Sequence, residues 1–322
     1  MFFTLILSSL LTFVELNCEN LFDTVHDSLK NDMEYTPGSE YHWTNTRYWK
    51  KLNDIAKEII ALGGDENQPS LATSQWQLPD FVAMCEVEND SVMVALTKRS
   101  LLRHARYEYL MTQSPDERGI DVALMYSPAS FRPIRSYSIR IKQLPGTRPT
   151  RDILYASGLL VSDDTLHIFV VHAPSRRGGE VASRPYRLQV ANQLALAVDS
   201  IYAINAHAHV MVTGDFNDYS DSPALDSLYR HRLVNISADA MGRNGAKGTY
   251  RYHGEWRSLD QMLCSPALAA CKEDCKIGDL RFLLEEDEKY GGMKPFRTYI
   301  GPKYKGGYSD HLPLVARFRI KE

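Results

Sequence analysis

Short apolar runs that each end in a polar side chain recur along this chain of 322 residues. The four clearest runs are TFVELN (12–17), DFVAMCE (80–86), LHIFVVH (166–172) and HVMVTGD (209–215). They end, in chain order, at Asn17, Glu86, His172 and Asp215. Near-continuous apolar character over so few residues is typical of strands in sheets that are covered on both faces. The pattern therefore predicts buried strands whose ends carry chemically reactive side chains.

Segments with helical periodicity alternate with these strands. The predicted helices cover residues 47–64, 91–102 and 186–204, and a polar loop is predicted over 65–79. Helices alternate with pairs of strands, so an all-parallel sheet is not expected. Two stacked sheets with helices outside fit the order better. Because no linker or repeat divides the sequence, residues 1–322 are predicted to form a single domain.

The overall charge limits how the protein can contact a polyanion. The formal net charge is −3, whereas a protein that grips duplex DNA through its phosphates usually has a basic surplus. Any basic contact surface is therefore expected to be local. The odd number of cysteines does not suggest a disulfide framework, and Cys18, Cys85 and Cys264 are predicted to be buried thiols.

The N-terminal residues MFFTLILSSLL (1–11) form an apolar lead-in. They lack a basic start and a small-residue cleavage site, and they are shorter than the about 20 residues of a membrane span. A remnant signal peptide, an anchor and the start of a first strand remain open. Stable membrane insertion is not expected, and the location stays open between the bacterial cytoplasm and export. The short loops favour a monomer.

The polar residues at strand ends and turns form a chemically coherent set. Its members are Asn17, Glu86, His172, Asp215, Asn217, Asp260, Asp310 and His311. Carboxylates and carboxamides without a thiolate suit a hard cation such as Mg²⁺ or Mn²⁺. Histidines beside an aspartate suit proton transfer. The arginines of two loops, Arg118, Arg176 and Arg177, suit a phosphate group.

Seven motifs carry a resemblance to a known family. They are LNCENLFD, CEVEN, RGIDVALMY, VVHAPSRRGG, GDFND, RSLDQML and YSDHLPL, in this order across residues 14–315. The chain resembles bacterial-type members of the endonuclease/exonuclease/phosphatase superfamily, which includes deoxyribonuclease and exonuclease III. The resemblance implies a four-layer α/β/β/α sandwich of two mixed, mostly antiparallel sheets flanked by helices. It also implies a metal-dependent hydrolase that acts on phosphate esters.

The resemblance implies roles for the strand-end residues. Asn17, Glu86 and Asp310 match metal-binding positions, with Glu86 as the primary carboxylate. The catalytic positions that match are His172, Asp215, Asn217, Asp260 and His311. Among these, Asp215 corresponds to the residue that orients the attacking water, His172 to an acid near the leaving oxygen, and Asp260 and His311 to a carboxylate–imidazole pair. Arg118, Arg176 and Arg177 are predicted to bind the substrate phosphate.

Three functional hypotheses follow from these observations. The first is a Mg²⁺- or Mn²⁺-dependent phosphodiesterase, most simply an endonuclease or exonuclease acting on nucleic acid. The second is a phosphatase or phosphodiesterase acting on a small-molecule or lipid-headgroup phosphate. The third is a binding protein with a degenerate site, which is disfavoured because no expected acidic or histidine position is replaced.

The segment GTYRYHGEWRSLD contains aromatic residues with two interpretations. Tyr250 and Trp256 could stack on a base or sugar, or they could pack behind the site. The sequence does not decide between these interpretations. It also shows no lysine-rich phosphate motif, and no exposed, aromatic-rich hairpin for binding a membrane is expected.

Overall fold

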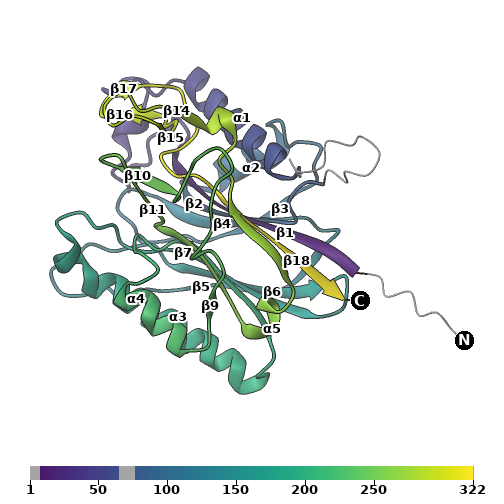
Figure 1. Ribbon diagram of the computed structural model, residues 1–322. Helices are drawn as coiled ribbons and strands as arrows, with labels where there is room; N and C mark the ends of the chain where they lie inside the picture. The colour runs from purple at the N-terminus through teal and green to yellow at the C-terminus, as the bar shows by residue number, and fades with distance from the viewer. Residues whose placement is uncertain (1–7, 65–76, 322) are drawn as a thin grey trace, which may run out of the picture.

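Two six-stranded sheets lie at the centre of the protein (Figure 1). The computed structural model describes residues 8–64 and 77–321. In spatial order, the strands of the first sheet are β13 (Lys272–Ile277), β18 (Leu314–Lys321), β1 (Ser8–Leu21), β2 (Phe81–Val87), β4 (Asp121–Tyr126) and β3 (Glu108–Met111). Those of the second are β5 (Phe131–Ile139), β6 (Ile153–Leu160), β7 (Thr165–His172), β8 (His209–Asp215), β12 (Asp260–Cys264) and β9 (Val234–Asn235).

Each sheet contains one parallel pair of strands. The pairs are β1 with β2 and β7 with β8, and the other neighbours are antiparallel. Strands that run parallel end at the same edge of a sheet, and this edge is where Asn17, Glu86, His172 and Asp215 lie. The predicted sheets, mixed and mostly antiparallel, are confirmed.

Helices cover the outer face of each sheet and complete four layers (Figure 1). α1 (Asn45–Leu62) and α2 (Asp90–Lys98) pack on the first sheet, and α3 (Glu180–Ile204) and α4 (Pro223–Arg230) pack on the second. The short α5 (Pro266–Ala269) follows β12. The four-layer α/β/β/α arrangement predicted from the resemblance is confirmed.

Alternation along the strands places apolar side chains on both faces of each sheet. In β1, Phe13 lies between the two sheets, where its ring stacks on Phe81 at 4.3 Å, whereas Val14 and Leu16 face the helices. Residues 8–11 of the apolar lead-in form the start of β1, and residues 1–7 lie outside the described residues. Cys18, Cys85 and Cys264 are buried, as predicted.

Two of the predicted helices differ from those in the structure in length. α3 begins at Glu180, before the predicted start, and contains Pro185 in its second turn. α2 ends at Lys98 instead of residue 102. Most of the predicted polar loop, residues 65–76, lies outside the described residues.

Small two-stranded hairpins lie at the edge of the sandwich where the parallel pairs of strands end. They are β10 (Tyr250–Tyr252) with β11 (Glu255–Arg257), β14 (Leu284–Glu286) with β15 (Met293–Pro295), and β16 (Tyr299–Ile300) with β17 (Lys303–Tyr304). Single 3-10 turns lie at Met33–Tyr35 and Arg281–Leu283. In the described part of the chain, no helix has the length and apolar character needed to cross a membrane.

Candidate active site

Strand register brings the predicted residues of the second sheet together. His172 pairs with Asp215 across the parallel strands β7 and β8, and Asp260 pairs with Asp215 across β8 and β12. Three side chains with catalytic chemistry therefore stand side by side at one edge. Asp260 and Asp215 are almost completely buried.

Asp215 is held by amide groups from two directions. Asn17 Nδ2 of the first sheet donates to Asp215 Oδ2 at 3.0 Å, and the backbone N–H of Asn217 donates to Oδ1 at 2.7 Å. Asn217 has a left-handed backbone with φ of 49°, a conformation that is rare for residues other than glycine and is often found at functional sites. Burial, and next the Asp260 carboxylate, raise the pKa of Asp215 to about 7.

His311 and Asp260 form a buried imidazole–carboxylate pair. Their Nδ1 and Oδ2 atoms are 2.7 Å apart, and the Thr249 hydroxyl donates to the same oxygen. Burial lowers the pKa of His311, but the charge of Asp260 and its hydrogen bond outweigh this effect, so the pKa is raised well above its usual value. A cationic imidazole is therefore favoured at this position.

His172 lies close to site residues from both sheets. Its Nε2 is 3.7 Å from Asp215 Oδ2 and 3.9 Å from Glu86 Oε1, and its buried Nδ1 has no hydrogen-bond partner. Burial, and next the positive charge of Arg151, hold the pKa of His172 well below its usual value. The imidazole is therefore neutral in this environment.

Two further carboxylates complete the set. Glu86 adopts a left-handed backbone, with φ of 62°, and its Oε2 accepts a hydrogen bond from the backbone N–H of Asn20 at 2.9 Å. Asp310 Oδ2 accepts from Arg297 at 2.9 Å, and Arg297 also contacts Glu19. Arg297 thereby fixes the side chain of Asp310 at the edge of the site.

The donor atoms fit a hard divalent cation. In the described residues, Asp215, Asp260 and His311 each offer a ligand atom, and these atoms lie within 4.8 Å of one another. Asp260 and His311 are already bonded to each other, which makes them poor ligands in this arrangement. The predicted ligands Glu86, Asn17 and Asp310 have the carboxylate and carboxamide oxygens that Mg²⁺ or Mn²⁺ prefers and line the same cavity, but they do not belong to this close group.

A cavity of about 900 Å³ gives access to these side chains. All the predicted site residues line it except Asp260, which lies behind His311. The predicted substrate-binding arginines Arg118, Arg176 and Arg177 line it too. Arg176 stacks over the ring of Tyr219 at 4.3 Å, and its buried Nη1 has no hydrogen-bond partner. This guanidinium is therefore fixed by a ring while it keeps a donor available for an anion.

The comparisons with known proteins agree with this geometry. A family model described as "Endonuclease/Exonuclease/phosphatase family" matches residues 12–319. The chain belongs to the endonuclease/exonuclease/phosphatase family. Members of this family are hydrolytic phosphoesterases and are generally dependent on divalent metal ions. No curated protein sequence matches the chain.

Solved structures of the same fold include bacterial and human proteins. An endonuclease/exonuclease/phosphatase family protein from Bacteroides thetaiotaomicron has 13% identity and a TM-score of 0.61, with 98% of this chain and 99% of that chain covered. A mannosyl-6-phosphatase from the same organism has 13% identity and a TM-score of 0.61, with 95% and 98% covered. The human Nocturnin catalytic domain has 18% identity and a TM-score of 0.56, with 97% and 94% covered.

The family resemblance and the sequence motifs did not identify several buried polar residues of the site. Arg151 lines the cavity and donates to the carbonyl of Ala173 at 2.7 Å and to Asp116 at 3.4 Å, while its buried Nε has no partner. Glu15 is fully buried without a hydrogen-bond partner, and burial raises its pKa well above the usual value. A charged residue inside the apolar run TFVELN was the available signal for Glu15.

The structure distinguishes the two interpretations of the aromatic segment. Trp256 is partly buried and packs against the core between the sheets, so the packing interpretation holds for this residue. Tyr250 instead lines the cavity, with its ring centroid 5.0 Å from that of His311. Tyr252, on the same strand β10, is 60% exposed.

Proposed function

We propose that this protein is a divalent-metal-dependent phosphodiesterase that cleaves nucleic acid. One observation carries the proposal: the Asp260–His311 pair and the amide-bonded Asp215 meet at one cavity, beside cationic side chains. A buried carboxylate, a cationic imidazole and an oxygen-rich ligand set are the groups that attack of water on phosphorus requires.

Each residue of the site has a separate role in the reaction. Asp215 orients the attacking water and accepts its proton, because the amides of Asn17 and Asn217 hold its carboxylate at the cavity. The new bond forms between the water oxygen and phosphorus as the bond to the leaving oxygen breaks. His311, held cationic by Asp260, donates a proton or hydrogen bond to the departing or non-bridging oxygen. Asn217 Nδ2 donates to the Ala173 carbonyl at 3.1 Å and to Asp215 Oδ2 at 3.3 Å, and it would exchange one of these bonds for one to the phosphate.

The neutral state of His172 bears on which histidine supplies the proton. The charges around the two rings favour His311 as the donor and leave His172 as a neutral hydrogen-bonding group. A Mg²⁺ or Mn²⁺ ion held by Glu86, with Asn17 and Asp310, would neutralise negative charge on the phosphate oxygens. Arg118, Arg176 and Arg177, which line the cavity, would contact the phosphate.

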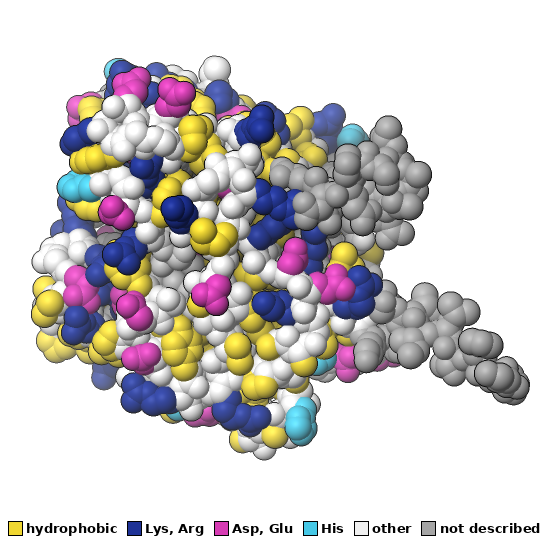
Figure 2. All heavy atoms as spheres, in the orientation of Figure 1, with side chains coloured by type: hydrophobic (Ala, Val, Ile, Leu, Met, Phe, Trp, Pro, Cys, Tyr) yellow, Lys and Arg dark blue, Asp and Glu magenta, His cyan; other side chains and the backbone are white. Residues whose placement is uncertain are grey.

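The distribution of charged side chains on the surface favours a local electrostatic contact with the substrate over a broad one. On the face in Figure 2, Lys and Arg side chains are interspersed with Asp and Glu, in keeping with the net charge of −3. The cationic residues that line the cavity are Arg118, Lys142, Arg148, Arg151, Arg176 and Arg177. Carboxylates line the same cavity, and Arg118, Arg148 and Arg151 form ion pairs with Asp116 or Glu117. The positive charge is therefore partly compensated, and the arginines favour a substrate phosphate through their forked donors at the site.

The experiment that tests the proposal compares ester classes. The protein is assayed with bis-p-nitrophenyl phosphate, p-nitrophenyl phosphate, plasmid DNA and a single-stranded oligonucleotide, each with Mg²⁺, Mn²⁺ or EDTA. Metal-dependent cleavage of the diester and of at least one nucleic acid supports the proposal. A metal-dependent response confined to the monoester contradicts it and supports the alternative, a phosphatase acting on a small molecule or lipid headgroup.

A further inference from the structure

A row of aromatic rings leads from the site to the surface. The ring of Tyr250 lies beside His311, and the ring of Tyr252 is nearly parallel to it, at 15°, with centroids 6.5 Å apart. Tyr252 stacks on His253 at 4.0 Å and 13°, and His253 stacks on Tyr290 at 5.8 Å and 27°. We call these four residues, Tyr250, Tyr252, His253 and Tyr290, the aromatic row.

Local backbone geometry builds the first three members of the row. Tyr250 and Tyr252 are two residues apart on β10, so their side chains leave the strand on the same side. A two-residue turn follows, in which His253 and Gly254 both have positive φ, 50° and 85°. This is the geometry that matches the twist of a tight hairpin, and it brings the His253 ring under that of Tyr252.

A second set of contacts fixes Tyr290 against the hairpin. A Cβ atom on Gly254 would lie 2.9 Å from Cβ of Tyr290, so a glycine is needed for this close approach. Arg251, on the opposite side of β10, donates to the carbonyls of Met293 at 2.6 Å and Gly291 at 2.7 Å. The hairpin and the segment that carries Tyr290 are therefore tied together before any ligand binds.

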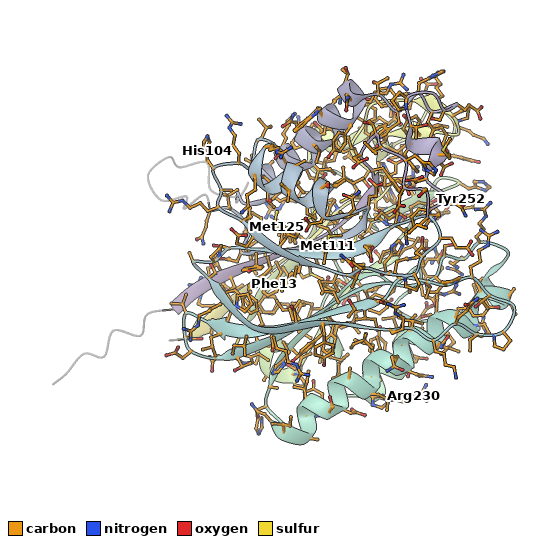
Figure 3. The ribbon with its side chains drawn as sticks, turned by 180° about the vertical axis from the view of Figure 1, so that it is seen from behind. Phe13, His104, Met111, Met125, Arg230 and Tyr252 are labelled. Carbon is orange, nitrogen blue, oxygen red and sulfur yellow. The ribbon has the colours of Figure 1, made fainter. Side chains whose placement is uncertain are left out.

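The row is exposed, although stacked rings of this kind are usually buried. Tyr252 is 60% and Tyr290 42% exposed, and Figure 3 shows Tyr252 at the outer edge of the molecule. Tyr250 and Tyr252 line the cavity. A cation accompanies the row, because Lys289 lies over the ring of Tyr290 at 4.9 Å. Arg257, the neighbour of Tyr250 across the hairpin, instead places its guanidinium over the ring of Tyr219 at 5.4 Å. Exposed rings with a cation beside them resemble the stacking platforms of proteins that bind single-stranded nucleic acid.

We propose that the aromatic row binds the unpaired bases of a single-stranded nucleic acid whose backbone phosphate lies at His311. This inference rests on the proposed phosphodiesterase function and names its substrate class. The faces of bases in a duplex are covered by their neighbours, so only a single strand or an unpaired end offers them to the rings. The row begins at the catalytic histidine, so a base that stacks on it places an adjoining phosphate in the cavity.

The chemistry of the row favours bases over a lipid surface. Its rings carry polar hydroxyl and imidazole groups, and Glu255 lies exposed on the same hairpin. A carboxylate at the tip of a hairpin opposes insertion into an apolar phase. The same tyrosines can stack on a planar base while their hydroxyl groups stay in water.

The test measures binding without cleavage. Fluorescence anisotropy follows a labelled single-stranded DNA 12-mer, its duplex, and a 12-mer of abasic residues, with Mg²⁺, in an Asp260→Asn background that slows turnover and keeps the His311 imidazole. The added variants are Tyr252→Ala, Tyr290→Ala and Tyr252→Phe. Tyr137→Ala is the matched control, since Tyr137 is also 42% exposed but lies on β5.

The proposal predicts that each alanine variant weakens binding of the single strand by about 10-fold, while Tyr252→Phe and Tyr137→Ala change it less than twofold. The abasic 12-mer is expected to bind weakly and equally in all variants. Unchanged binding of the single strand in both alanine variants, or an equal loss for the abasic strand, would overturn the platform. So would loss of binding to phosphatidylserine vesicles in Tyr252→Ala without an effect on DNA, which would assign the row to a lipid surface.

The binding role of the aromatic row and the proposed hydrolytic function are tested by separate measurements. Hydrolysis of bis-p-nitrophenyl phosphate by the unmodified protein reports on the catalytic residues and does not need a base. If the diester is hydrolysed and the row variants bind DNA normally, the platform alone is wrong. If the row variants lose DNA binding and the diester is not hydrolysed, the platform stands and the hydrolytic function is wrong.

Discussion

Nδ1 of His311 lies 2.7 Å from Oδ2 of Asp260, and the carboxylate is completely buried. The hydroxyl of Thr249 donates to the same oxygen, so the carboxylate is held from two sides. Because Nδ1 is committed to Asp260, Nε2 is the nitrogen that remains for a substrate. The orientation and the charge of the imidazole thus both depend on one buried residue of the second sheet.

Replacing Asp260 with asparagine is therefore expected to damage catalysis more than binding. The amide has nearly the same shape but cannot stabilise an imidazolium, so kcat for bis-p-nitrophenyl phosphate should fall by about 100- to 10,000-fold with little change in KM. Steady-state kinetics on the purified variant measure both constants, and thermal unfolding confirms that the variant is folded. A kcat near the wild-type value would remove Asp260 from the catalytic site.

Removal of the Glu86 carboxylate tests the assignment of the metal. Glu86→Gln keeps the size of the side chain and removes its charge, so the Mg²⁺ concentration needed for half-maximal rate should rise by about 10- to 100-fold. A Mg²⁺ titration of the rate measures this value. An unchanged titration would move the cation away from Glu86, for instance to the group formed by Asp215, Asp260 and His311.

Charge reversal in the loop after His172 tests substrate binding. With Arg176→Glu and Arg177→Glu combined, KM for an oligonucleotide should rise by at least about 10-fold, with a smaller effect on kcat, because the two phosphate contacts become repulsive. Arg230→Glu is the control, since Arg230 is exposed on α4, well apart from Tyr252 at the cavity (Figure 3). Equal KM values in the double variant and the control would show that the loop arginines are solvated and do not contact the substrate.

The buried Glu58 predicts a pH dependence of stability. Glu58 on α1 has no hydrogen-bond partner, and burial raises its pKa to about 8 from an ordinary value of 4.5. Between these values the folded state binds more protons than the unfolded state, so the free energy of unfolding falls as pH rises. Between pH 5 and 8.5, the free energy of unfolding should fall by up to about 4 kcal/mol less in Glu58→Gln than in the wild type.

Urea unfolding of both proteins at pH 5 and pH 8.5 measures the effect. A residual slope is expected in the variant, because burial also raises the pKa of Glu88 to about 8. Identical pH slopes in the wild type and Glu58→Gln would show that Glu58 does not titrate in this range.

Strand ends were the part of the site that sequence could predict. A buried run that stops at a polar residue is visible in one sequence, and the runs that end at Glu86, His172 and Asp215 were all found in β2, β7 and β8. The sequence did not reveal β5, because most of its residues are exposed and polar and its pairing with β6 is shifted near Pro133. Such an edge strand lacks the apolar run on which the prediction depended.

Contacts between residues far apart in the sequence could not be predicted from the sequence alone. The bond between Asn17 and Asp215 joins residues 198 positions apart, and the contact of Arg297 with Glu19 joins residues 278 apart. Neither has a local pattern, since each arises from the packing of one sheet or loop on another. The aromatic row depends on the positive φ of His253, which also leaves no mark in the sequence.

The measurement that tests the central claim most directly is hydrolysis of bis-p-nitrophenyl phosphate by the wild type and His311→Ala, each with Mg²⁺ and with EDTA. We expect turnover by the wild type with Mg²⁺, its loss in EDTA, and a fall of at least about 100-fold in His311→Ala. Turnover that persists in EDTA, or that His311→Ala retains at the wild-type rate, would contradict a metal-dependent phosphodiesterase site at this edge of the sandwich.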